Sequence, residues 1–346
     1  MSELIRLDPY GPRNEEMFLS EMNQLTSHHI FGCPEYGQIW AEWEEATEVE
    51  DLPFLHVGLF KRLSLKTASA KYSAQRVLHS SSTTGTSSKI QLDTYSSEMQ
   101  SISSNKILAD YLGAGKAPLL ILDSVKSLRQ RGSVSAKIAA AMSLKQFATD
   151  MIFILENDNP ASLKLDILES VLRSHDTFIV YGFSWMMWLA WGNAKFTKKI
   201  KTLLKGKTIK FVHSGGWKKL EAEKVDQKLF KEGLLSNLSG ESIVLDYYGL
   251  VEQIGIVYPI CEGGWRHVPV WADILIRDSY SLESLVGSIG QIQLMNSISW
   301  GAPYHNVLTE DLGLISEYPC DCGRSGKRFQ LHGRIPKAEM RGCANV

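Results

Sequence analysis

Residues 208–217 read Thr-Ile-Lys-Phe-Val-His-Ser-Gly-Gly-Trp, and this stretch indicates how the chain is built. An apolar run ends here in a polar loop that contains two glycines. Similar apolar runs occur at residues 118–122, 151–155, 177–180 and 242–245. Helical patterns separate these runs, at residues 133–150, 161–174 and 192–204. Strands that alternate with helices predict an α/β fold, in which a parallel sheet carries helices on its faces.

The loops that follow two of the predicted strands are candidates for a ligand site. Residues 213–217 follow one strand, and residues 246–249, Asp-Tyr-Tyr-Gly, follow the next strand along the chain. Ligands of open parallel sheets bind at the C-terminal ends of the strands, in the loops. We therefore expect both loops to contribute to one site.

The pattern changes along the chain and divides it into three parts. Residues 1–60 predict an N-terminal helical cap, with helices over residues 15–26 and 36–47. We expect residues 61–260 to form the α/β body that binds the nucleotide and the acyl group. Residues 261–346 predict a smaller β-rich subdomain that ends in a C-terminal tail. Its expected antiparallel strands cover residues 272–277, 291–295, 306–308 and 328–331.

Composition excludes several classes of function. The 346 residues are 44% hydrophobic and 22% charged, with a formal net charge of -1, so a nucleic-acid partner is not expected. The polar N-terminus does not resemble a signal peptide, and the most apolar run, residues 177–191, is too short for a membrane span. Five cysteines that include a Cys-x-Cys pair suit a reducing cytoplasm.

Residues 79–90 read His-Ser-Ser-Ser-Thr-Thr-Gly-Thr-Ser-Ser-Lys-Ile and form a hydroxyl-rich segment. Its backbone N–H groups, hydroxyls and ammonium group suit the phosphates of a nucleotide. The kinase and GTPase P-loop pattern is absent. The alternative is a Ser/Thr-rich surface linker. The candidate phosphate-binding residues are Ser81, Ser82, Thr83, Thr84, Gly85, Thr86, Ser87 and Lys89.

Three further positions carry candidate nucleotide contacts. Glu252, after Tyr248 and Gly249, could hold Mg²⁺ beside a triphosphate, or it is a solvated first-turn glutamate. Asp311, which we expect before a tight turn, could accept hydrogen bonds from two ribose hydroxyls, or it is a turn residue. Arg334 could contact ribose or phosphate, or it is a surface charge.

The chain contains, in order, the hydroxyl-rich segment, Gly215-Gly216, the segment from Tyr248 to Glu252, Asp311 and Arg334. This series resembles the motif series of the adenylate-forming superfamily, which includes acyl-CoA synthetases and phenylacetate-CoA ligases. The chain resembles one family more closely, the acyl-protein synthetases of the LuxE type. The features that carry this resemblance are Leu-Pro-Phe at 52–54, Phe-Lys at 60–61, the loop from His79, residues 213–218, and the ending from Gly333 to Cys343.

The resemblance implies a fold and a reaction. The fold is the N-terminal domain of adenylate-forming enzymes, without the mobile C-terminal domain, because the chain stops shortly after Arg334. In the reaction, a fatty acid is activated by ATP to an acyl-adenylate. The acyl group then forms a thioester on a cysteine of the enzyme and passes to an acyl reductase.

The resemblance also implies roles for the candidate residues. The hydroxyl-rich loop, with Lys89 as a catalytic residue, would hold the β- and γ-phosphates, and Gly215 and Gly216 would abut the adenine. Glu252 would bind Mg²⁺, while Asp311 and Arg334 would hold the ribose. Val251 stands where the superfamily usually has threonine.

Cys343 is the candidate acyl acceptor. It lies three residues from the end, and nearby Lys337 and Arg341 favour the nucleophilic thiolate. A terminal segment is expected to be mobile, so it could carry the sulfur into the site and out to a partner. The alternative is an incidental thiol.

The remaining candidate cluster consists of Cys261, His267, Cys320 and Cys322. Three thiolates and one imidazole match a closed, structural zinc site. The alternative is four unrelated side chains.

The aromatic and methionine side chains of residues 177–191 suit a long acyl tail, or they belong to an ordinary buried strand and helix. Trp265, Trp271 and Trp300 could extend the same wall. His213 and His305 are expected to be hydrogen-bonding loop residues rather than general bases.

Three hypotheses follow for the whole chain. The first is an ATP- and Mg²⁺-dependent enzyme that acylates its own Cys343. The second is a ligase that passes the acyl group to coenzyme A or a carrier protein. The third is an inactive scaffold bound to a reductase or acyltransferase, supported by Val251.

Overall fold

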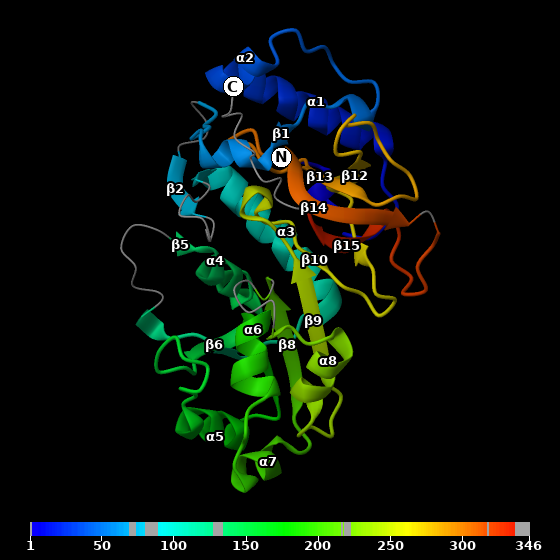
Figure 1. Ribbon diagram of the computed structural model, residues 1–346. Coiled ribbons are helices and arrows are strands. Elements are labelled where there is room, and N and C mark those ends of the chain that lie inside the picture. The colour runs from blue at the N-terminus through cyan, green and yellow to red at the C-terminus, as the bar shows by residue number, and fades with distance from the viewer. Residues whose placement is uncertain are drawn as a thin grey trace, which may run out of the picture.

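The computed structural model describes residues 2–68, 74–79, 89–126, 134–215, 217, 223–316 and 318–335. Two six-stranded sheets and one three-stranded sheet organise these residues. In Figure 1, the sheet with β8 and β9 lies in the lower half of the view, and the sheet with β12 to β15 lies in the upper half.

The lower sheet has the strand order β10-β9-β8-β7-β4-β6. All its strands run parallel except β10, which pairs antiparallel with β9. The predicted parallel sheet is therefore confirmed. The strands are β4 (Ala117–Ile121), β6 (Ala148–Phe153), β7 (Thr177–Phe183), β8 (Thr208–Ser214), β9 (Ile243–Tyr248) and β10 (Tyr258–Pro259).

Helices follow the strands, as the alternating pattern predicts. One prediction is wrong, because the helix expected over residues 133–150 ends early: Leu144 and Phe147 turn into the core and β6 begins at Ala148. The elements are α4 (Ala136–Ser143), η5 (Lys145–Phe147), α5 (Leu165–Ser174), α6 (Ser184–Met187), the π-helix η6 (Trp188–Gly192), α7 (Lys198–Leu204) and α8 (Gln227–Leu235).

The upper sheet has the order β11-β15-β14-β13-β12, and β1 pairs with β14 in parallel. Its four longer strands contain the four segments predicted from the sequence. The strands are β1 (Leu55–His56), β11 (Arg266–His267), β12 (Ala272–Arg277), β13 (Gly290–Asn296), β14 (Asn306–Ser316) and β15 (Arg328–Arg334).

The tight turn expected at residues 309–313 is wrong, because these residues continue β14. The pairing of β14 with β15 shifts register between Asp311 and Gly313. A Cβ atom at Gly313 would lie 2.7 Å from Ile292 Cδ1 and 2.8 Å from the Gln330 carbonyl oxygen. The glycine therefore serves close strand packing rather than a turn.

The N-terminal residues pack against the upper sheet. Phe18 and Met22 of α1 share a buried core with Trp271 and Leu294. The structure contains the helix predicted from residue 15 but shortens the second one, because the side chain of Asn23 holds Ala46 in a non-helical segment through two hydrogen bonds. The elements are η1 (Leu4–Arg6), α1 (Glu15–Gly32), α2 (Pro34–Ile39), η2 (Val49–Asp51) and η3 (Val57–Lys61). The division at residues 60 and 260 stays a prediction.

Helix α3 (Thr94–Leu112) connects the parts of the molecule (Figure 1). Asp93 caps its first turn by accepting from Ser96 N. Its Ser103 Oγ accepts from Trp271 Nε1 and donates to the Gly255 carbonyl oxygen. The small sheet β3-β2-β5 precedes and follows α3 in the chain, with β2 (Ala74–His79), β3 (Lys89–Asp93) and β5 (Val134–Ser135).

Among the described residues, no helix combines the length and the apolar character that crossing a membrane requires.

Candidate functional site

Tyr248, Asp311 and Arg334 meet where the two large sheets approach each other. Tyr248 ends β9, and Asp311 pairs with Arg334 across β14 and β15. The Tyr248 hydroxyl donates to Asp311 Oδ2 at 2.7 Å, and Arg334 Nε donates to Asp311 Oδ1 at 2.8 Å. The structure therefore brings together three residues that the sequence singled out over a span of 87 positions, counted from 248 to 334.

The electrostatics of this cluster fix its donors and acceptors. Burial, and then the charge of Asp311, raises the pKa of Tyr248 well above its ordinary value, so the hydroxyl stays a donor. The Asp311 side chain is 12% exposed, whereas the Arg334 side chain is 66% exposed. Each carboxylate oxygen keeps a second lone pair, so Asp311 can still accept hydrogen bonds from a ligand.

Glu252 lies in the short helix η8 (Val251–Gln253), close after Tyr248 in the chain, and is buried. Its neighbour Gln253 anchors the segment by donating to Tyr304 O at 2.7 Å and accepting from Asn296 Nδ2 at 2.7 Å. Gly249, which as a glycine could allow a tight turn before Glu252, does not adopt left-handed backbone. A Cβ atom there would make only ordinary contacts, the nearest at 3.5 Å.

Gly215 follows β8 with a left-handed φ of 73°. The Ser184 hydroxyl donates to the Gly215 carbonyl oxygen at 2.6 Å and lies 2.9 Å from His213 Nδ1. Because the Ser184 proton points to Gly215, the His213 Nδ1–H donates to Ser184. The ends of β7 and β8 are thus tied together at the glycine turn.

His213 is a hydrogen-bonding residue, as expected, but it lies within strand β8 rather than in a loop. Ser184 Oγ and Asp246 Oδ1, at 2.9 and 3.7 Å, both approach its Nδ1. A Ser-His-Asp triad places serine and aspartate on opposite ring nitrogens, so this group is not one. Burial lowers the pKa of His213, which keeps the ring neutral at pH 7.

Arg266 secures the end of β9. It is buried and donates to the Tyr258 carbonyl oxygen at 2.8 Å and to the Asp246 carbonyl oxygen at 3.3 Å. It also forms an ion pair with the Asp246 carboxylate. This contact fixes the backbone two residues before Tyr248.

Several predicted site residues cannot be placed. The phosphate-loop candidates 81–87, Gly216 and Cys343 lie outside the described residues. Lys89 is the first residue of β3, and only its backbone is described. The roles of these residues stay predictions.

The aromatic run at residues 177–191 belongs largely to a buried core. Phe178, Met186, Met187 and Trp191 are at most 2% exposed. Trp271 lies in a different core cluster, against the upper sheet. The alternative of an ordinary buried strand and helix therefore accounts for these side chains.

His305, the other histidine considered, packs against helix α1. Its Nε2 lies 3.1 Å from Thr26 Oγ1, and its ring packs against His29 at 4.8 Å between centroids. Burial lowers the pKa of His305 to about 3, so the ring is neutral.

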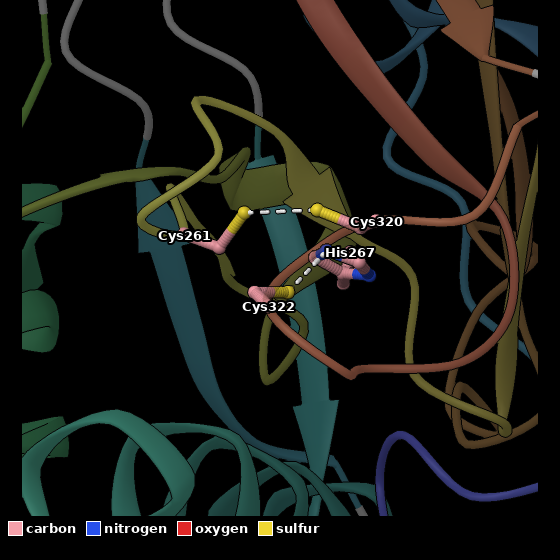
Figure 2. Close-up of side chains that lie close together, drawn as sticks. All are labelled: Cys261, His267, Cys320 and Cys322. Carbon is pink, nitrogen blue, oxygen red and sulfur yellow. Dashed lines mark hydrogen bonds between the residues drawn. The ribbon is translucent and has the colours of Figure 1, made fainter.

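The four candidate metal ligands lie together. Figure 2 shows Cys261 beside Cys320 and His267 beside Cys322, with the side chains pointing toward one another. The sulfurs of Cys261 and Cys320 are 3.6 Å apart, and Cys322 Sγ lies 3.2 Å from His267 Nε2. All four ligand atoms lie within 4.8 Å of one another. Burial lowers the pKa of His267 to about 4, and neutral imidazole is the form that binds metals.

Comparison with solved structures defines the class of fold. The chain is similar to 2-hydroxyisobutyryl-CoA ligase in complex with 2-HIB-AMP, at 14% identity and a TM-score of 0.65, over 93% of this chain and 68% of that one. The same ligase in complex with 2-HIB-AMP and CoA is 15% identical, with a TM-score of 0.66, over 95% of this chain and 70% of that one. The fold is that of the adenylate-forming ligases.

The family follows from the sequence itself. The model of the family described as "Acyl-protein synthetase, LuxE" matches residues 23–346. The chain therefore belongs to the acyl-protein synthetase family, as its motifs predicted. A search of curated proteins gives no match.

Two buried polar residues, Ser184 and Arg266, were missed as parts of the site, although Asp246, to which Arg266 pairs, lay in a predicted loop. Ser184 lies inside the apolar run 177–191, and Asp246 follows Ile-Val-Leu. A polar residue at the end of a buried strand was the available signal. The pairing between them depends on strand order, which the sequence does not give.

Proposed function

We propose that this chain activates a carboxylic acid with ATP and then carries the acyl group on Cys343. A carboxylate oxygen of the acid attacks the α-phosphorus, a new P–O bond forms, and the bond to pyrophosphate breaks. The Cys343 thiolate then attacks the acyl carbon, a C–S bond forms, and AMP leaves. Family membership supports a long-chain fatty acid as substrate and an acyl reductase as recipient.

The observation that carries this proposal is the Asp311 cluster. Tyr248 and Arg334 each donate to one oxygen of the Asp311 carboxylate, and these two hydrogen bonds fix its orientation. The vicinal hydroxyls of a ribose offer two further donors at the spacing of one carboxylate. The donor set therefore fits a nucleoside, with Arg334 exposed enough to reach its sugar or phosphate.

The other described residues of the site have compatible chemistry. The Gly215 turn leaves its backbone accessible on a rigid strand end, which suits the flat face of a base. Glu252 supplies a hard carboxylate oxygen, the type of ligand through which Mg²⁺ reaches nucleotide phosphates. Bound Mg²⁺ would neutralise phosphate charge. On this proposal Asp311 and Arg334 orient the ribose of the bound nucleotide.

Exchange of labelled pyrophosphate into ATP tests the adenylation step. We expect exchange that depends on both the acid and Mg²⁺, strongest with long-chain fatty acids among a panel of carboxylates. The Asp311→Asn variant should lose most of the exchange. Absence of exchange with every acid would contradict the proposal and favour an inactive scaffold.

Intact-mass measurement after incubation with ATP and acid tests the thioester step. We expect the mass to rise by one acyl group, reversibly with hydroxylamine, and no such rise in Cys343→Ser. The matched control is Cys33→Ser, which changes a cysteine outside the candidate site. Undiminished acylation of Cys343→Ser would remove Cys343 from the mechanism. Exchange without any acylation, together with product formed on coenzyme A or a carrier protein, would identify the alternative acceptor.

A further inference from the structure

Two segments that lie 59 positions apart in the chain form turns of the same design. In the first, Gly264 N donates to the Cys261 carbonyl oxygen at 2.9 Å, and in the second, Gly323 N donates to the Cys320 carbonyl oxygen at 3.1 Å. Both glycines have left-handed φ values, 78° and 80°. Each turn therefore has a cysteine at its first position and a glycine, which tolerates this backbone, at its fourth.

The two turns bring their sulfurs together at a distance that suits a metal rather than a covalent bond. In a tetrahedral zinc site with Zn–S bonds of about 2.3 Å, neighbouring sulfurs are about 3.8 Å apart. The Cys261 and Cys320 sulfurs are 3.6 Å apart, and a disulfide requires about 2.05 Å. Cys322 and His267 complete four ligand atoms within 4.8 Å, enough for one ion (Figure 2).

The residues around the four ligands leave room for the sulfur atoms and connect the cluster to the rest of the fold. A Cβ atom at Gly263 would lie 3.0 Å from Cys320 Sγ and 3.6 Å from Cys261 Sγ, so the glycine leaves the room that the sulfur pair occupies. Arg324, which follows Cys322 by two residues, pairs with Asp110 at 2.6 Å and packs over the Tyr111 ring at 3.9 Å. The cluster is therefore linked to α3 as well.

The local backbone contains little regular secondary structure. Strand β11 has only two residues, Arg266 and His267, and residues 318–327 contain no helix or strand. Small loop-rich elements of this kind usually depend on a cross-link such as a disulfide or a metal. His267 belongs to the cluster, and its neighbour Arg266 holds Asp246 at the end of β9.

We propose that Cys261, His267, Cys320 and Cys322 bind one structural zinc ion, and that this ion fixes β11 so that Arg266 holds the end of β9 in place. The zinc site itself is independent of the adenylation reaction. The consequence for ATP binding rests on the proposed function. The ion takes no part in the chemistry, because four protein ligands leave no open position.

Metal analysis of the full chain tests the site. Protein purified without added metal should contain about one zinc per chain. The Cys320→Ser, Cys322→Ser double variant should lose most of it, and Cys33→Ser, which changes a cysteine outside the cluster, should keep it. Replacement of zinc by Co²⁺ in the wild-type chain should give thiolate charge-transfer absorption and intense tetrahedral d–d bands, a readout that does not depend on variant folding.

Three results would overturn the metal site. They are zinc well below half an ion per chain with no cobalt spectrum after reconstitution, iron in place of zinc, or an intact mass two units low from a disulfide between Cys261 and Cys320.

Hydrogen exchange tests the link through Arg266. Zinc removal should speed exchange of the backbone amides at residues 246–249 by at least about tenfold, while peptides from α5 stay unchanged. Arg266→Lys should produce the same local change with zinc fully retained. Loss of zinc without faster exchange at the end of β9 would overturn the link. Faster exchange without any defect in pyrophosphate exchange would uphold the link and separate it from the proposed function.

Discussion

The Asp311 cluster and the cysteine-histidine cluster are built in opposite ways. Tyr248, Asp311 and Arg334 lie on three strands, and the hydrogen bonds between neighbouring strands hold them in position. The metal-ligand candidates lie on two tight turns and one two-residue strand. A site on strands is positioned by the fold before any ligand binds, whereas a site on turns needs its ligand to become rigid.

Arg266 joins the two regions, because it lies next to His267 and holds the end of β9 that leads to Tyr248. The nucleotide site therefore depends on the metal site, but the metal site does not depend on the nucleotide site. Damage to the metal site should reach the nucleotide site, but damage to the nucleotide site should leave the metal site intact.

The largest expected effect comes from removal of the metal. Chelation should lower the free energy of unfolding by roughly 3 kcal/mol, similar to the loss of a native cross-link. Chemical denaturation with and without chelator measures it, with added Zn²⁺ restoring stability and added Mg²⁺ failing to do so. Equal stability of both forms would mean that the turns are rigid without an ion.

Asp311→Asn should strike the nucleotide site alone. The substitution keeps the shape but removes the charge that accepts from Tyr248 and Arg334, so we expect kcat/KM for ATP to fall by about 100-fold. The zinc content should not change. Glu310→Gln on the same strand is the matched control and should lose much less. A similar loss in both variants would indicate a general charge effect.

The sequence predicted the parallel strands well, because continuous apolar runs identify buried strands without tertiary information. The prediction was wrong at residues 309–313. The sequence Thr-Glu-Asp-Leu-Gly is typical of a turn, but these residues form part of β14 because they pair with β13 and β15. The cysteine-histidine cluster could be anticipated from residue type and spacing. Arg266 and Ser184 could not, because their partners are set by strand order.

Gly313→Ala tests how closely the strands of the nucleotide site pack. The new methyl group would meet Ile292 and the backbone at Gln330, so we expect a loss of roughly 1–3 kcal/mol in the free energy of unfolding. Gly115→Ala, where nothing lies within 4 Å of the new atom, is the control. An unchanged midpoint in thermal unfolding for Gly313→Ala would contradict the packing.

Two buried histidines, His29 and His305, should make the free energy of unfolding depend on pH. Burial lowers the pKa of His29 well below its ordinary value and that of His305 to about 3. The unfolded chain binds these protons near pH 6.5 and the folded chain does not, so stability is full above about pH 6.5 and falls below it. Each histidine contributes about 1.4 kcal/mol per pH unit.

Chemical denaturation at pH 7.5 and pH 5.5 measures this pH dependence. His305→Gln should flatten it, and a substitution of the exposed His332 should not. A slope that is the same in both variants would show that His305 titrates normally in the folded state.

Tyr248→Phe should have the smallest effect. It removes one hydrogen bond to Asp311 and keeps the ring, so KM for ATP should rise about fivefold, roughly 1 kcal/mol. Tyr258→Phe is the matched control, because the Tyr258 hydroxyl is buried without a hydrogen-bond partner among the described residues. Steady-state kinetics compare the two, and equal effects would remove the Tyr248 hydroxyl from nucleotide binding.

A crystal structure of the zinc-loaded chain with Mg²⁺ and a non-hydrolysable α,β-methylene analogue of ATP tests the central claim most directly. The account predicts both ribose hydroxyls within hydrogen-bond distance of the Asp311 carboxylate, with Arg334 at the sugar or phosphate and Glu252 on the ion. A nucleotide bound elsewhere, with Asp311 hydrogen-bonded only to Tyr248 and Arg334, would contradict it.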